Sequence, residues 1–190
     1  ESGVSNSILR RQDKCSNESW KIAYHGSPHH LIQGFNSLKF ALKNLKSDFD
    51  VELKVITNID LLPESICKTR SFKIDFVEYN HETIYQDLLD VDIGFVPQLA
   101  PKTAIGNICD RIFPFLIWKN GYVNDVTLRT KFSCNAGRSF VFSKAGIPVV
   151  QEPSFEALAS YSGKDFALMP TTTKELESAF RSLMSDSLGY

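Results

Sequence analysis

The sequence predicts an α/β fold: a Rossmann-like, doubly wound parallel sheet of about six strands, in the order 3-2-1-4-5-6, within a single domain. From residue 20 onward, short apolar runs alternate with segments of helical periodicity, which is the pattern of a parallel sheet with helices on both faces. The composition also fits a globular domain, because 43% of the 190 residues are hydrophobic and 23% are charged.

The strands are expected at the short apolar runs. Phe72, Ile74 and Phe76 alternate with polar residues, which predicts a strand with one face in solvent, near an edge of the sheet. The run at 93–96 is apolar throughout, which predicts a strand near the centre. The six expected strands are residues 20–24, 51–57, 72–77, 91–96, 147–150 and 166–169.

The first helix has the clearest periodicity, because five apolar side chains from Leu31 to Leu45 recur at spacings of 4, 3, 4 and 3. Ser27 is expected to cap this helix, and Pro28 suits its first position, where an N–H would be unpaired anyway. The last helix opens with the Thr-x-x-Glu spacing of a capping box. This last helix is expected at 172–184, and two further helices are expected at 81–89 and 137–144.

Two segments depart from the alternation of strands and helices. Residues 1–19 are mostly polar and are interpreted as a linker or disordered arm, so the domain is expected to span 20–190. Residues 98–129 form an insertion that is too long for a featureless loop and contains an aromatic-rich stretch at 113–118. The insertion could act as a lid or a contact surface, or it could simply pack its own aromatic side chains.

Charge and cysteine content narrow the possible functions. Lys and Arg number 21 against 22 Asp and Glu, a net charge of −1, and the basic residues are scattered, so neither nucleic acid nor an anionic membrane is the expected partner. No apolar run approaches the roughly 18 residues of a membrane span, and the polar start lacks the apolar core of a signal peptide. The four cysteines lack zinc-pair spacing and are too few for a disulfide-built scaffold of this length, so we expect a reduced, cytoplasmic setting.

The predicted topology directs attention to the carboxyl ends of the strands, because ligands of such sheets bind where the strand order reverses, between strands 1 and 4. The turn His25-Gly26-Ser27 lies there. Glycine permits close approach to the backbone, the next helix presents free N–H groups, and Ser27 adds a hydroxyl, which together suit a diphosphate. An ordinary capped turn is the alternative. No Gly-x-Gly-x-x-Gly follows, which argues against a dinucleotide cofactor.

A second group of polar residues precedes and opens the helix at 137–144. Lys131 and Arg138 supply cations, Ser133 a hydroxyl and Asn135 an amide. These charges and the helix N-terminus could together hold a nucleotide diphosphate. A solvated helix start is the alternative interpretation.

Metal and hydrolase sites have little support in the sequence. His25, His29 and His30 are close together, but no His-Glu-x-x-His pattern accompanies them, so we expect solvent-facing histidines and no metal site. There is no Gly-x-Ser-x-Gly motif and no Cys/His pair recognisable by spacing, so a hydrolase triad is not expected.

From residue 20 to its end, the chain resembles the C-terminal, donor-binding domain of GT-B glycosyltransferases, in the group that includes glycosyl transferase families 1 and 4. The most specific stretch is 131–150, where a Lys, a Ser/Asn segment, an Arg and a helix precede Gly-Ile-Pro-Val-Val. The other stretches that carry the resemblance are 25–27, 88–97 and 175–184.

The resemblance implies where a nucleotide diphosphate sugar would bind. It puts the donor phosphates against His25, Gly26 and Ser27, and the nucleotide near Asn58 and Tyr79. It lines the pyrophosphate and sugar end of the site with Lys131, Ser133, Asn135 and Arg138.

The sequence departs from the family pattern at one position of that site. The family usually has a Glu in the helix before the Gly-x-Pro strand, where its carboxylate pairs with the ribose hydroxyls. This chain has Val141 there. Either Gln151 or Glu152 replaces that Glu from the next loop, or the nucleotide site is altered or lost.

The resemblance therefore implies the donor-binding half of an enzyme that moves a sugar from UDP- or GDP-sugar to a hydroxyl of a sugar or glycoconjugate, without a cofactor or an obligatory metal. A complete GT-B enzyme is about twice as long as this chain, and its N-terminal acceptor domain commonly supplies the catalytic base. The alternative is a non-catalytic Rossmann-like binding module with a degenerate nucleotide site. A weaker alternative is another enzyme class on the same sheet, such as a sugar-phosphate epimerase.

Overall fold

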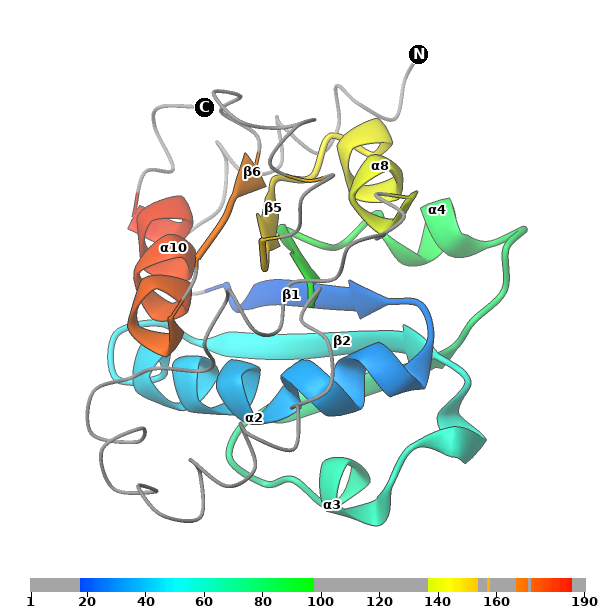
Figure 1. Cartoon of the computed structure of the whole chain (residues 1–190), viewed down its shortest axis with the longest axis horizontal. Helices are drawn as coiled ribbons and strands as arrows, with labels where there is room; N and C mark the ends of the chain where they lie inside the picture. The colour runs from blue at the N-terminus through cyan, green and yellow to red at the C-terminus, as the bar shows by residue number, and fades with distance from the viewer. Residues whose placement is uncertain (1–17, 98–136, 154–156, 158–166, 171, 186–190) are drawn as a thin grey trace.

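The computed structural model describes residues 18–97, 137–153, 157, 167–170 and 172–185. It contains a six-stranded parallel sheet in the order β3-β2-β1-β4-β5-β6, which confirms the predicted fold class and strand order (Figure 1). The strands are β1 (Trp20–His25), β2 (Val51–Thr57), β3 (Lys73–Glu78), β4 (Ile93–Val96), β5 (Val149–Gln151) and β6 (Ala167–Leu168).

The exposure of the strands matches the pattern in the sequence. In β3, at one edge of the sheet, Lys73 and Asp75 are exposed while Ile74 and Phe76 are half-buried. In β4, beside the central β1, all four residues are buried. The alternation of apolar and polar residues in β3 is therefore explained by its position at the edge of the sheet. The continuous run of apolar residues in β4 is explained by its burial on both faces.

Helices cover both faces of the sheet. α2 (Pro28–Leu45) and α10 (Thr173–Ser185) pack against one another and share one core cluster with alternate residues of β1. α4 (Ile84–Asp87) and α8 (Gly137–Lys144) contribute to a second cluster, which includes Ala23 of β1. Because successive residues of a strand point to opposite faces, β1 separates the two clusters, as a doubly wound sheet requires. Within the described ranges, no helix has both the length and the apolar character needed to cross a membrane.

Two helix starts differ in how they are capped. Ser27 is the N-cap residue of α2, but its hydroxyl makes no capping hydrogen bond, so the expected side-chain cap is wrong. The Ser27 carbonyl instead accepts the His30 N–H at 3.1 Å. In α10 the expected cap is present, because Thr172 Oγ1 accepts the Glu175 N–H at 3.1 Å.

The segments between β2 and β4 differ most from expectation. α4 is shorter than the predicted helix at 81–89, because Asn80 Oδ1 accepts the Glu82 N–H at 2.9 Å and holds a turn before the helix begins. A 3₁₀ helix, η1 (Ile59–Leu61), and one further turn, α3 (Glu64–Cys67), follow β2 and were not expected. The predictions for residues 1–17 and 98–129 lie outside the described residues.

α8 has the predicted bounds, and two glycines fix its position. The chain leaves the helix at Gly146, whose φ of +71° is the left-handed conformation of a Schellman motif. There the Ile147 N–H donates to the Phe142 carbonyl at 2.9 Å. On the sheet side, a Cβ added to Gly94 of β4 would lie 2.5 Å from Phe142 Cγ. Gly94 therefore leaves room for the Phe142 ring to lie directly on the sheet, and this contact sets the distance between α8 and the sheet.

Candidate functional site

The β1–α2 turn and the start of α8 meet at the carboxyl end of β1, where the strand order reverses between β1 and β4. His25, the last residue of β1, makes a 3.1 Å hydrogen bond from Nε2 to the backbone carbonyl of Arg138. The two residues are 113 positions apart in the sequence. Two of the stretches predicted to contact a diphosphate, 25–27 and the start of the helix at 137, are thereby brought together.

His25 is neutral at neutral pH. A carbonyl oxygen only accepts, so Nε2 must carry the ring proton. The side chain is buried, and its ring meets the edge of Phe142 with 4.8 Å between the centroids. Burial lowers the pKa of His25 to about 4, and the Arg138 charge lowers it further, although the hydrogen bond to the carbonyl acts in the opposite direction. His25 therefore joins β1 to α8 and supplies no positive charge for a ligand.

Gly26 is required by the side chain of Arg138. Its φ is +123°, a backbone conformation that other residues rarely adopt. An added Cβ would lie 3.0 Å from Arg138 Cδ and 3.6 Å from the hydroxyl oxygen of Tyr24. The aliphatic part of Arg138 thus crosses the turn at the place where the sequence predicted close approach of a ligand. Thr57 holds the turn from β2, because its hydroxyl donates to the Gly26 carbonyl at 2.6 Å.

Tyr24 belongs to this site and was not identified from the sequence. Its side chain is fully buried, and its hydroxyl donates to the Ser27 carbonyl. Burial raises the pKa of Tyr24 to about 12, while the nearby Arg138 guanidinium acts to lower it. A buried phenol needs a polar partner, and Tyr24 stands one residue from the end of the strand, which is the signal that could have indicated its role.

The corner of the fold formed by these elements has a positive character. Helix N-termini carry a partial positive charge, and those of α2 and α8 both adjoin the turn that follows β1. Neither helix has an acidic residue in its first turn, and Arg138 is the second residue of α8. With His25 and Tyr24 neutral, the two helix dipoles and the Arg138 guanidinium favour an anion at the β1–α2 turn, while the buried carboxyl group of Glu152, after β5, lies at the same edge of the sheet.

Gln151 and Glu152 end β5 at the same edge of the sheet, and both are buried. Gln151 Oε1 accepts a hydrogen bond from the Ser139 hydroxyl of α8. Its Nε2 has no hydrogen-bond partner among the described residues. Gln151 therefore offers a donor, whereas the Glu of the family pattern offers an acceptor. Val141, which stands in the place of that Glu, packs against the second core cluster.

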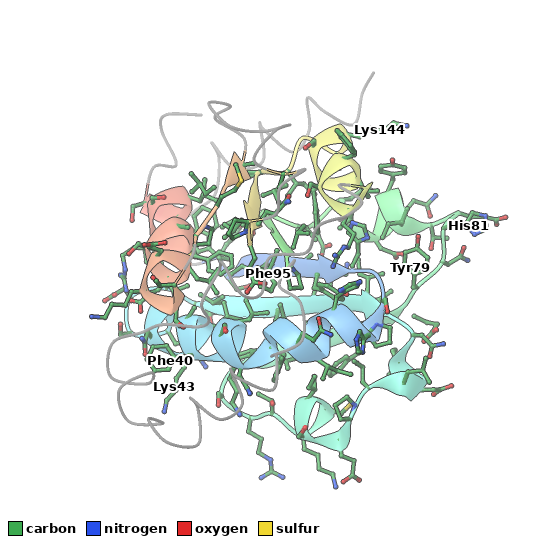
Figure 2. The ribbon with its side chains drawn as sticks, viewed as in Figure 1. Phe40, Lys43, Tyr79, His81, Phe95 and Lys144 are labelled. Atoms are coloured by element: carbon green, nitrogen blue, oxygen red, sulfur yellow. The ribbon has the colours of Figure 1, made fainter. Side chains whose placement is uncertain are left out.

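Asn58 and Tyr79 lie farther along the same edge. Asn58 is exposed directly after β2, and Tyr79, 44% exposed, follows β3 with its N–H donating to the Thr57 carbonyl at 3.1 Å. Figure 2 shows Tyr79 beyond the end of the sheet toward which the β1 and β2 arrows point. Both residues thus share the edge with the β1–α2 turn, on the side of β2 and β3.

Three of the predicted ligand-binding residues, Lys131, Ser133 and Asn135, lie outside the described residues. The prediction of solvent-facing histidines is confirmed for His29, which is exposed and contacts Gln33 through Nε2 at 2.7 Å, but it is wrong for His25, whose side chain is buried at the end of β1. No group of three or more metal-ligating side chains occurs in the described part of the chain.

Neither models of known protein families nor the curated proteins give a match to this chain. A function must therefore be argued from the geometry of the site and from the sequence motifs that it contains.

Proposed function

We propose that this chain is the donor-binding domain of a GT-B-type glycosyltransferase, and that it binds the diphosphate of a UDP- or GDP-sugar between the β1–α2 turn and the start of α8. The observation that carries the proposal is the hydrogen bond from His25 to the Arg138 carbonyl, because it joins two of the stretches on which the resemblance rests. The positive character of this corner suits a diphosphate and would not suit a neutral ligand.

The chemistry assigned to the site is charge stabilisation. When the bond between the sugar and the diphosphate breaks, negative charge develops on the leaving diphosphate. The Arg138 guanidinium and the N-termini of α2 and α8 are fixed in advance and would stabilise that charge without a metal. By the resemblance, Tyr79 and Asn58 are near the nucleotide, and the half-exposed ring of Tyr79 can stack on a base. The acceptor and the catalytic base belong to a separate N-terminal domain.

A calorimetric titration tests the donor site. The ligands are UDP, GDP and their sugars, with UMP as the monophosphate comparison. We expect UDP or GDP to bind and Arg138→Gln to weaken that binding by about tenfold or more, since a charge-assisted contact to a phosphate contributes about 1.5–3 kcal/mol. Lys144→Gln is the matched control, because Lys144 is an exposed cation at the other end of α8 (Figure 2). The donor site is excluded if a folded chain binds none of these ligands at millimolar concentration.

The second candidate is a non-catalytic module with a degenerate nucleotide site. Val141 favours it, since an apolar residue packed in a core cluster cannot pair with ribose hydroxyls. In such a module Phe140, 56% exposed on α8, would be a candidate contact residue for a protein partner. A module of this kind predicts that no nucleotide binds and that Phe140→Ser reduces self-association in analytical ultracentrifugation. Unchanged association, or tight nucleotide binding, would exclude it.

A further inference from the structure

We propose that Tyr24 is a positioning residue of this site, whose hydroxyl group holds the Arg138 side chain over the β1–α2 turn in the orientation needed to contact a diphosphate. This inference rests on the function proposed above. Tyr24 itself is fully buried in the core, so it would act through Arg138 and would not touch the ligand.

The two side chains converge on one place above Gly26. The point where a Cβ of Gly26 would lie is 3.6 Å from the Tyr24 hydroxyl oxygen and 3.0 Å and 3.7 Å from Cδ and Cγ of Arg138. Arg138 comes from α8 and Tyr24 from β1, so the convergence depends on the docking of α8 on the sheet. The hydrogen bond from His25 to the Arg138 carbonyl fixes the backbone of Arg138, and Tyr24 is placed to fix its side chain.

The hydrogen-bonding capacities of the two groups are complementary. The Tyr24 hydroxyl donates its one hydrogen bond to the Ser27 carbonyl. Toward Arg138 the phenol oxygen can therefore act only as an acceptor. A guanidinium can only donate, so a hydrogen bond between the two groups would run from Arg138 to the phenol oxygen, which lies close to the Arg138 side chain above Gly26. In the proposed arrangement the phenol is bound to the β1–α2 turn through Ser27 and accepts a hydrogen bond from the guanidinium of Arg138.

A neutral partner suits this role better than a carboxylate would. Because burial raises the pKa of Tyr24 to about 12, the phenol is protonated at every pH at which the protein would function. It orients the guanidinium without placing a further negative charge beside it. An Asp or Glu at the same position would neutralise the positive charge of the guanidinium.

Tyr24→Phe isolates this interaction. The substitution keeps the buried ring, and the Ser27 carbonyl keeps a hydrogen-bond partner because it still accepts the His30 N–H at 3.1 Å. The experiment combines Tyr24→Phe with Arg138→Gln in a double-mutant cycle and measures the dissociation constants of UDP and UMP by calorimetry. Tyr85→Phe, at a 40% exposed tyrosine of α4, is the matched control.

We expect Tyr24→Phe to weaken UDP binding by about five- to tenfold when Arg138 is present, as the loss of one hydrogen bond allows, and to have no further effect beside Arg138→Gln. UDP should lose more affinity than UMP, which a general loosening of the fold would not produce. In an Arg138→Lys background, where the planar fork is absent, Tyr24→Phe should again add nothing.

The outcomes separate the two proposals. If Arg138→Gln weakens UDP binding but Tyr24→Phe has the same effect in both backgrounds, Tyr24 does not act through Arg138, and the proposed function still stands. If Tyr24→Phe weakens UDP and UMP equally, its role is structural and the inference is wrong. If folded wild-type protein does not bind UDP or GDP, the proposed function fails and the inference fails with it.

Discussion

Acidification from neutral pH should destabilise this protein through His25. The folded-state pKa of His25 is about 4, against an ordinary value of 6.5 in an unfolded chain. Between these values the unfolded chain binds a proton that the folded protein does not bind, so stability falls as the pH falls. The contribution of neutral His25 is complete above pH 6.5 and is lost progressively toward about pH 4.

The magnitude follows from the two pKa values. Their difference of about 2.5 corresponds to about 3 kcal/mol once the pH is well below 4, and to about 2 kcal/mol between pH 7.5 and pH 5. Two carboxylates act outside this interval. Hydrogen bonds from Arg181 to Asp48 lower the pKa of Asp48, and those from Lys21 and Lys54 outweigh burial and lower the pKa of Asp90. Their contributions are therefore lost only below the ordinary value of 3.8.

Urea unfolding of wild type and His25→Gln at pH 7.5, 6.5, 5.5 and 5.0 measures this effect. Glutamine can still donate to the Arg138 carbonyl and does not titrate, so the variant should lose about 2 kcal/mol less than wild type over this range. His81→Gln is the control, because the His81 side chain is 82% exposed, and it should follow wild type. Parallel pH curves for wild type and His25→Gln would refute the assignment of a buried, neutral His25.

Three substitutions test other parts of the account, each by urea unfolding. Gly94→Ala puts a Cβ within 2.5 Å of the Phe142 ring and should cost about 1–3 kcal/mol; an unchanged midpoint would mean that α8 does not rest on that contact. Ser139→Ala leaves Gln151 Oε1 buried without its donor and should cost about 1–3 kcal/mol, whereas Ser139→Ala with Gln151→Leu should cost less than the sum of the single changes. Thr172→Ala removes the cap of α10 and should cost about 1 kcal/mol, which Thr172→Ser should largely restore.

The layout of the sheet could be predicted because burial leaves a direct record in the sequence. The alternation in β3 and the unbroken apolarity of β4 follow from their positions at the edge and near the centre of the sheet. α8 was bounded correctly, because Gly146 must adopt a left-handed conformation where the helix ends. α3 and η1 were missed because one turn of helix is too short to show a 3.6-residue period.

The location of the candidate site could also be predicted, but not its internal arrangement. That Gly26 accommodates Arg138, and that the Ser27 carbonyl serves Tyr24, depend on how α8 docks on the sheet. No local pattern encodes such contacts. The sequence likewise suggested that Gln151 could accept a hydrogen bond from ribose. In the structure its carbonyl oxygen already accepts one from Ser139, and only its amide nitrogen has no hydrogen-bond partner among the described residues.

The central claim is that the corner between the β1–α2 turn and α8 binds a nucleoside diphosphate through Arg138. The most direct measurement compares the dissociation constants of UDP and UMP, and of GDP and GMP, for wild type and Arg138→Gln. We expect wild type to bind one diphosphate about tenfold or more tightly than its monophosphate, and Arg138→Gln to abolish that preference while the fold is retained. Equal affinities of wild type for diphosphate and monophosphate, or an Arg138→Gln variant that keeps the preference, would contradict the claim.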